Sequence, residues 1–216
     1  MQTQNKLDRD YNALALFRYT IPSILSLLFM SLYQMVDAIF VSQFVSENAL
    51  ASINIVYPVI SVVLAVTLML STGGSAIVAR KLGEGKAQAA KEDFSVLILT
   101  TVILSALITI FTTFFMEPLL KFMGATPALW QDCYDYLRIL ILFMPAAALQ
   151  LSFSSFFITA GKPNLGFILT ILSGATNIFL DYLLIVKIPM GISGAAWGTA
   201  IGYLVAAVPG LLYFLL

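Results

Sequence analysis

The chain has 216 residues, of which 60% are hydrophobic and only 10% are charged, and its net charge is zero. An ordinary soluble domain carries about 25% charged residues, so most of this surface must face lipid rather than water. The sequence contains no histidine and a single cysteine, Cys133. This composition excludes a basic nucleic-acid-binding face, a histidine-built metal or catalytic site, an internal disulfide and a cysteine zinc cluster.

Long apolar stretches between charged residues predict membrane-spanning helices. A transmembrane helix needs about 20 apolar residues, and the chain provides six such stretches, interrupted only by Asp37 and Asp181. Turn sequences rich in Gly, Pro, Asn or charge separate them. We predict helices at residues 14–45, 50–79, 94–116, 132–160, 164–186 and 193–216. The fold class that follows is an all-α integral membrane protein, with one six-helix transmembrane domain over residues 1–216.

The distribution of basic residues predicts the orientation. Lys and Arg favour the cytoplasmic side of a membrane. Of the 11 basic residues, three (Lys121, Arg138 and Lys187) fall on one side of the predicted helices and eight fall on the other. The eight are Lys6, Arg9, Arg18, Arg80, Lys81, Lys86, Lys91 and Lys162. Both termini are therefore expected in the cytoplasm.

The two intramembrane acids lie at matching depths. Asp37 is 19 residues beyond Arg18, and Asp181 is 19 residues beyond Lys162. At about 1.5 Å per residue each lies roughly 28 Å along its helix, in the outer half of the membrane. A carboxylate there must be protonated, paired or bound to a cation. We predict one shared site; in the alternative reading each acid reaches the headgroups or hydrogen-bonds to a neighbouring helix.

Other polar side chains are predicted at the same level. Asn177 lies one helical turn before Asp181 and on the same face. Thr199 lies about 9 Å below the outer end of the sixth helix, at about 1.5 Å per residue, and Tyr136 is near the outer start of the fourth. Their oxygens, with the carboxylates, form a hard ligand set suited to Na⁺ or a proton.

Two further residues are predicted to line a cavity. DAIFV at 37–41 and DYLLI at 181–185 are each followed by a cluster of small residues and then by a polar one, Asn54 or Thr199. This weak similarity between helix pairs suggests Asn54 as a secondary cavity residue. Gln34 is another, because a six-helix unit alone would leave its amide against lipid.

Four segments resemble the amino-terminal lobe of multidrug and toxic compound extrusion (MATE) transporters. They are MVDAIFVSQFVSENALASINIVYPV at 35–59, ARKLGEGKAQAAKED at 79–93, TAGKPN at 159–164 and, most specifically, NIFLDYLLIVKIPMGISGAAWGTAIGYLV at 177–205. Members of this family carry twelve helices in two six-helix lobes. The resemblance therefore implies that this chain is one lobe, which pairs with a second lobe or with another copy of itself.

The resemblance also implies a function. The family's cation site in this lobe falls on Asp37, Asn177, Asp181 and Thr199, with a nearby tyrosine at Tyr136. A family proline, where the first helix can bend, falls on Pro22. The implied activity is antiport: lipophilic, often cationic compounds are exported in exchange for Na⁺ or H⁺ across a bacterial or archaeal cytoplasmic membrane. No organic cofactor or enzymatic activity is implied.

Three alternatives remain open at this stage. A related flippase for lipid-linked sugars would share the architecture, although it would be expected to place several basic residues in its cavity. An isolated half-protein without transport activity would explain the length directly. An intramembrane enzyme using the two carboxylates is a different class, and the sequence lacks the His, Ser/Lys or metal-ligand constellation that such chemistry usually needs.

Overall fold

The structure is a computed structural model that describes residues 13–215, and all its regular elements are helices. The elements are α1 (Ala13–Phe44), α2 (Glu47–Gly83), α3 (Ala87–Phe114), α4 (Met116–Phe122), α5 (Trp130–Leu142), α6 (Met144–Thr159), α7 (Pro163–Asp181), the π-helix η1 (Tyr182–Lys187) and α8 (Ile192–Leu215). Among the described residues, five helices are long and apolar enough to cross a membrane, or six if α5 and α6 form one span. The predicted all-α integral membrane fold is confirmed.

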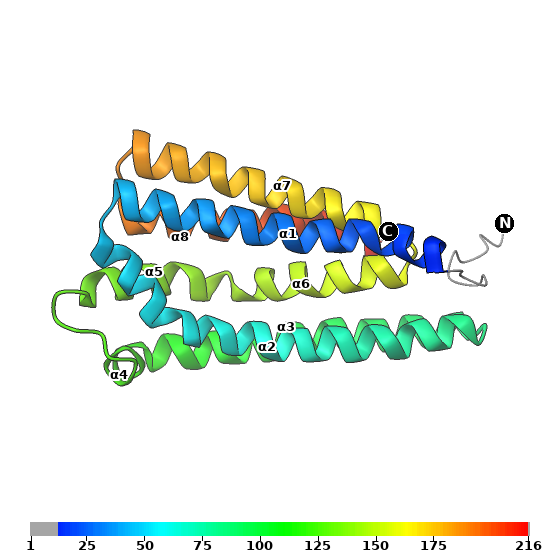
Figure 1. Cartoon of the computed structure of the whole chain (residues 1–216). Coiled ribbons are helices and arrows are strands. Elements are labelled where there is room, and N and C mark those ends of the chain that lie inside the picture. The colour runs from blue at the N-terminus through cyan, green and yellow to red at the C-terminus, as the bar shows by residue number, and fades with distance from the viewer. Residues whose placement is uncertain (1–12, 216) are drawn as a thin grey trace.

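The helices form an elongated bundle, in which α7 packs against both α1 and α8 while α2 packs against α3 and α6 (Figure 1). The start of α1, the end of α8 and the α2–α3 and α6–α7 turns all lie at one end of the bundle (Figure 1). That end carries the basic residues around Arg80 and Lys162 that predicted the cytoplasmic side. Lys6 and Arg9, which entered the same prediction, lie outside the described residues.

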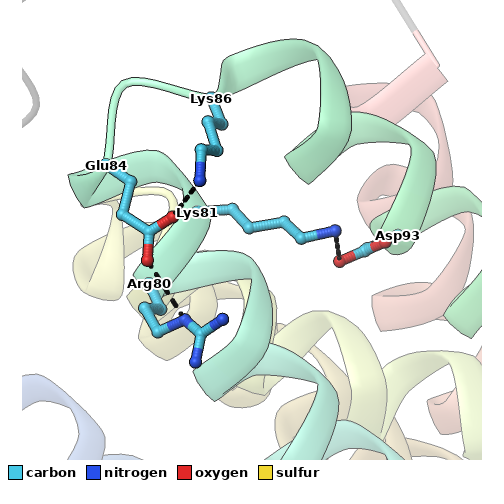
Figure 2. A network of polar contacts seen from close by, with 5 residues as sticks. All are labelled: Arg80, Lys81, Glu84, Lys86 and Asp93. Atoms are coloured by element: carbon cyan, nitrogen blue, oxygen red, sulfur yellow. Dashed lines mark hydrogen bonds and ion pairs between the residues drawn. The ribbon is translucent and has the colours of Figure 1, made fainter.

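A cluster of charged side chains closes the α2–α3 turn (Figure 2). Glu84 accepts a 2.7 Å hydrogen bond from Lys86 Nζ and forms an ion pair with Arg80 Nε at 3.3 Å, while Lys81 Nζ lies 2.6 Å from Asp93 Oδ2. The hydrogen bond from Lys86 lowers the pKa of the Glu84 carboxyl group below its ordinary value. Between the two helices the chain reverses at Gly85, whose φ of +73° favours glycine.

The second and third helices are longer than the apolar stretches that predicted them. The prediction ended the second helix at 79 and began the third at 94, whereas α2 runs to Gly83 and α3 begins at Ala87. Charged residues such as Lys81 and Lys91 are good helix formers, so they end the apolar run without ending the helix. The apolar stretches between charged residues therefore do not give the ends of these two helices.

The predicted single helix over 132–160 is wrong, because the chain bends by 55° between α5 and α6. Pro145, in the first turn of α6, has no N–H to donate to the carbonyl of Ile141 four residues earlier. The hydroxyl of Thr109 on α3 donates to that carbonyl instead, at 3.0 Å. A side chain from a neighbouring helix thus satisfies the backbone group that the proline leaves free.

The helix predicted over 164–186 is not α-helical along its whole length. Regular α-helix ends at Asp181, and residues Tyr182–Lys187 form a π-helix, closed by a 2.9 Å hydrogen bond from Ile188 N to the carbonyl of Leu183. Single π-turns of this kind occur frequently at functional sites. The widened turn begins directly after the aspartate predicted to bind the ion.

Small residues allow α7 and α8 to approach closely. Gly194, Gly198 and Gly202 recur every four residues and so lie on one face of α8, as is common where membrane helices touch. Side chains added at these positions would meet Leu184, Asp181 and Ser173 respectively. The close approach brings the polar face of α7 against the backbone of α8.

Candidate functional site

A cavity of about 300 Å³ lies between α1, α2, α5, α6, α7 and α8. Six of the seven ion-site and cavity residues predicted from the sequence line its wall: Gln34, Asp37, Asn54, Tyr136, Asn177 and Thr199. The seventh, Asp181, is fully buried and lies behind this wall. The helices thus bring all seven residues to one region of the protein.

Asp37 and Asp181 face each other across the α1–α7 contact, where their carboxyl groups interact electrostatically. Three of their oxygens are buried with no hydrogen-bond donor among the described residues: Asp37 Oδ1, Asp181 Oδ1 and Asp181 Oδ2. Ionised carboxylates only accept hydrogen bonds, so the pair cannot satisfy itself without a proton. Buried oxygens in this state call for a proton or a cation.

Asn177 and Thr199 join α7 to α8 beside the carboxylates. The amide nitrogen of Asn177 donates to the hydroxyl of Thr199 at 3.3 Å. The amide oxygen of Asn177 is buried and has no donor among the described residues, although the side chain is only 3% exposed. The hydrogen bond to Thr199 fixes the orientation of the Asn177 amide, and its unpartnered oxygen can accept a ligand.

Tyrosines surround Asp37 on the cavity side. Tyr136 is 5% exposed and lies within electrostatic reach of both Asp37 and Asp181. Three more tyrosines line the same cavity and were not singled out from the sequence: Tyr33, Tyr57 and Tyr203. The chain has 9 tyrosines, and nothing in the sequence pattern distinguishes these three from those that face lipid.

Sequence reasoning also missed a polar group deeper in the cavity. Gln150 Nε2 donates to Ser173 Oγ at 3.4 Å, and Ser173 Oγ donates to the carbonyl of Gly202 at 2.7 Å. The signal was available in part, because Ser173, Asn177 and Asp181 follow one another every four residues and so share one face of α7. Gln150 lies on α6, for which no such stripe exists.

Two of the predicted residues have looser surroundings. Gln34 and Asn54 line the cavity but are exposed. Pro22 lies within α1, which continues through it without a break, and the carbonyl of Pro22 accepts a 2.8 Å hydrogen bond from Ser26 Oγ. The hinge role of Pro22 stays a prediction.

The oxygens suit a small hard cation. No group of three or more His, Cys, Asp or Glu side chains that could hold a metal occurs among the described residues. Two carboxylates, one amide oxygen and one hydroxyl instead form an oxygen set with few charges, which fits Na⁺ or a proton rather than a soft transition metal. The unpartnered buried oxygens are the observation that supports this fit.

The family profile named MatE matches residues 22–183. The chain belongs to the MatE family. This confirms the family resemblance, since the matched region includes most of α1, all of α7 and the acids at 37 and 181. Two curated relatives, each called multidrug export protein MepA, are 25% identical over 200 residues in Staphylococcus saprophyticus and 23% identical over 201 residues in Staphylococcus aureus. Both alignments cover 93% of this chain, but only 44% and 45% of the relatives.

Solved structures show the same fold. An outward-facing multidrug resistance MATE family transporter matches with a TM-score of 0.91 and 24% identity, over 99% of this chain and 47% of that one. A transporter of the MOP superfamily from Pyrococcus furiosus, described by the reverse polarity of its binding pocket, matches with the same score, identity and coverage. The predicted fold, one lobe of a MATE-like transporter, is therefore confirmed, and the chain spans about half the length of these proteins.

Proposed function

We propose that this chain is the amino-terminal lobe of a cation-coupled efflux transporter in a bacterial or archaeal cytoplasmic membrane. The observation that carries the proposal is the set of buried oxygens on Asp37, Asn177 and Asp181, which lack donors and adjoin a cavity. Relatives named for multidrug export support the efflux function. On this proposal the basic end of the bundle, with both termini, faces the cytoplasm.

The proposed ion site consists of Asp37 and Asp181, assisted by Asn177 and Thr199, with Tyr136 beside the carboxylates. Binding of Na⁺ or H⁺ neutralises the carboxylate pair. Because the ligands come from α1, α7 and α8, an ion that fits one arrangement of these helices better than another shifts their equilibrium. That shift changes the shape of the cavity and releases the bound substrate outward.

The proposed substrates are lipophilic, often cationic compounds. The cavity wall combines aliphatic side chains with the four tyrosines and Asp37, and none of the described residues that line it is Lys or Arg. Aromatic faces attract cations, and varied apolar surfaces accept many shapes. A lipid-linked sugar carries phosphate, for which this wall offers no positive charge, so the flippase alternative is disfavoured.

A second lobe completes the proposed transporter, either as a further part of a longer chain or as a second copy. Exposed apolar residues run along α1, including Leu25, Leu28, Leu32 and Met35. These suit a partner lobe or lipid. The polar side chain of Gln34 suits only a partner or a wet cavity, because an unsatisfied amide costs several kcal/mol in lipid.

Transport in proteoliposomes containing the two-lobed protein tests the proposal. Efflux of a fluorescent lipophilic cation is measured under an imposed Na⁺ gradient and, separately, under a pH gradient. Asp181→Asn should abolish the response to the coupling ion, whereas Asp135→Asn, the same change on α5 away from the cavity wall, should leave it intact. If the ion gradient drove efflux by Asp181→Asn as well as it drives efflux by the wild type, the proposed coupling site would be overturned.

A further inference from the structure

Gly198 lies where α8 passes the end of α7, directly against the carboxylate of Asp181. A β-carbon at position 198 would lie 2.5 Å from Asp181 Oδ1 and 3.5 Å from Asn177 Nδ2. A β-carbon does not occur 2.5 Å from an oxygen in real proteins. The carboxylate thus occupies the space that any residue other than glycine would fill.

This contact differs from those of the neighbouring glycines on the same face of α8. At Gly194 an added β-carbon would meet the backbone of Leu184 at 3.1 Å, and at Gly202 it would meet the carbonyl of Ser173 at 3.3 Å. Those two positions are set by helix packing. At Gly198 the nearest atom is instead a buried carboxylate oxygen that no described donor satisfies.

The effect of a side chain at position 198 depends on whether the atom it would meet belongs to a side chain or to the backbone. Asp181 Oδ1 is the end of a side chain, so the carboxylate can rotate away while the helices keep their positions. Rotation would move the carboxylate oxygens of Asp181 away from their present position beside Asn177 and the backbone of α8. The fold would survive, but the relative placement of the oxygens would not.

We propose that Gly198 is a specificity-determining residue: by lacking a side chain, it leaves the space in which the Asp181 carboxylate can coordinate Na⁺. This inference rests on the proposed function. Na⁺ needs several oxygens at fixed distances at the same time, here from α1, α7 and α8. A proton binds one carboxylate oxygen and needs no cage. Gly198→Ala therefore weakens Na⁺ binding by about tenfold or more, as loss of supporting groups around a metal typically does, while proton binding is kept.

Equilibrium binding of ²²Na⁺ to the purified chain in detergent micelles tests this inference, with melting temperature as a second readout. We expect saturable binding in the wild type, at least about tenfold weaker binding in Gly198→Ala, and none in Asp181→Asn. Gly73→Ala is the control: it adds the same methyl group within a helix, where nothing lies within 4 Å of the new β-carbon, and it should keep wild-type Na⁺ affinity. Asp181→Asn should also remove part of the change in melting temperature with pH. Gly198→Ala should keep that part.

The inference would be overturned if Gly198→Ala bound Na⁺ as tightly as the wild type, or if the wild type bound no Na⁺. It would also be overturned if Gly198→Ala lost its responses to Na⁺ and to pH equally. If Asp181→Asn also left both responses unchanged, the proposed function itself would fail. A second variant covers the case in which Gly198→Ala does not fold. Asp181→Ala removes the obstructing carboxylate, so Asp181→Ala/Gly198→Ala should fold; failure of the double variant would show that Gly198 serves helix packing alone.

Discussion

Asn177 on α7 donates a 3.3 Å hydrogen bond to Thr199 on α8, while the buried Asn177 oxygen has no donor among the described residues. The bond links two helices that also approach through glycine contacts. An ion held by oxygens from both helices would therefore respond to small changes in their separation. The ion site and the helix contact are parts of one structure.

Removing the neutral oxygens should weaken the ion site without abolishing it. Asn177→Ala and Thr199→Ala each remove one uncharged ligand, for which we expect a loss of about 1 kcal/mol, or about fivefold in Na⁺ affinity. The effect on proton coupling should be smaller, because a proton needs no set of ligands. Titration of the melting temperature with Na⁺ measures both variants, and a loss as complete as that in Asp181→Asn would contradict the assigned roles.

The bend between α5 and α6 should depend on one hydroxyl group. Thr109→Val removes the side-chain donor to the carbonyl of Ile141, which then keeps only its contact with the N–H of Phe143, at a cost of about 1 kcal/mol. In a Pro145→Ala background the restored backbone N–H can donate to the same carbonyl, so the cost of Thr109→Val should shrink. Unfolding free energies of the two single variants and the double variant, measured in micelles, check this; strictly additive effects would refute the shared carbonyl.

Glu84 should contribute a small, pH-dependent stabilisation of the α2–α3 turn. Its pKa is lowered, first by the hydrogen bond from Lys86, so the folded state favours the ionised carboxylate. The stabilisation is therefore present above the ordinary carboxyl pKa and is lost as the pH falls through the lowered folded-state pKa. Glu84→Gln should lower the melting temperature at pH 7 in low salt, and less in about 1 M salt.

The control for that measurement is Glu92→Gln, which removes the same charge from an exposed site nearby. It should change the melting temperature less than Glu84→Gln does at pH 7. A difference between wild type and Glu84→Gln that grew as the pH fell would have the wrong sign and would rule out the ionised contact.

Cysteine labelling in intact cells tests the orientation. Cysteines placed at Gly85 or Lys162, in turns at the basic end of the bundle, should be protected from impermeant thiol reagents. Cysteines at Asn48 or Met190, at the opposite end, should be labelled. The native Cys133 is buried and should not contribute to the signal. The reverse pattern would invert the topology.

The depth of the two acids was predictable because the rise of an α-helix is constant. Arg18 and Lys162 mark the same end of two helices that run in parallel, so equal spacing placed Asp37 and Asp181 at one level. The same counting of apolar residues predicted six spans; the described residues hold five candidate spans, or six if the bent pair α5 and α6 is one span. What the spacing does not contain is the burial of Asp181 behind the cavity wall, which depends on the approach of α8 at Gly198.

Other features depend on contacts between distant segments. The bend at Phe143 had a local signal in Pro145, but the Thr109 hydroxyl that supports it comes from another helix. Tyr33, Tyr57 and Tyr203 converge on the cavity through helix packing, and aromatic residues are common throughout this apolar chain. The π-helix after Asp181 could not be predicted, because residues 182–187 contain no turn-forming residue.

The most direct test of the central claim asks whether Asp37 and Asp181 form one ion site. The melting temperature of the purified chain is measured against Na⁺ concentration and against pH for wild type, Asp37→Asn, Asp181→Asn and the double variant. Because a ligand that binds only the folded state stabilises it, the coupling ion should raise the wild-type melting temperature. Either single substitution should remove the whole Na⁺ response, and the double variant should show no further loss of it. A full response in Asp181→Asn, or two partial losses that add in the double variant, would contradict a shared carboxylate site.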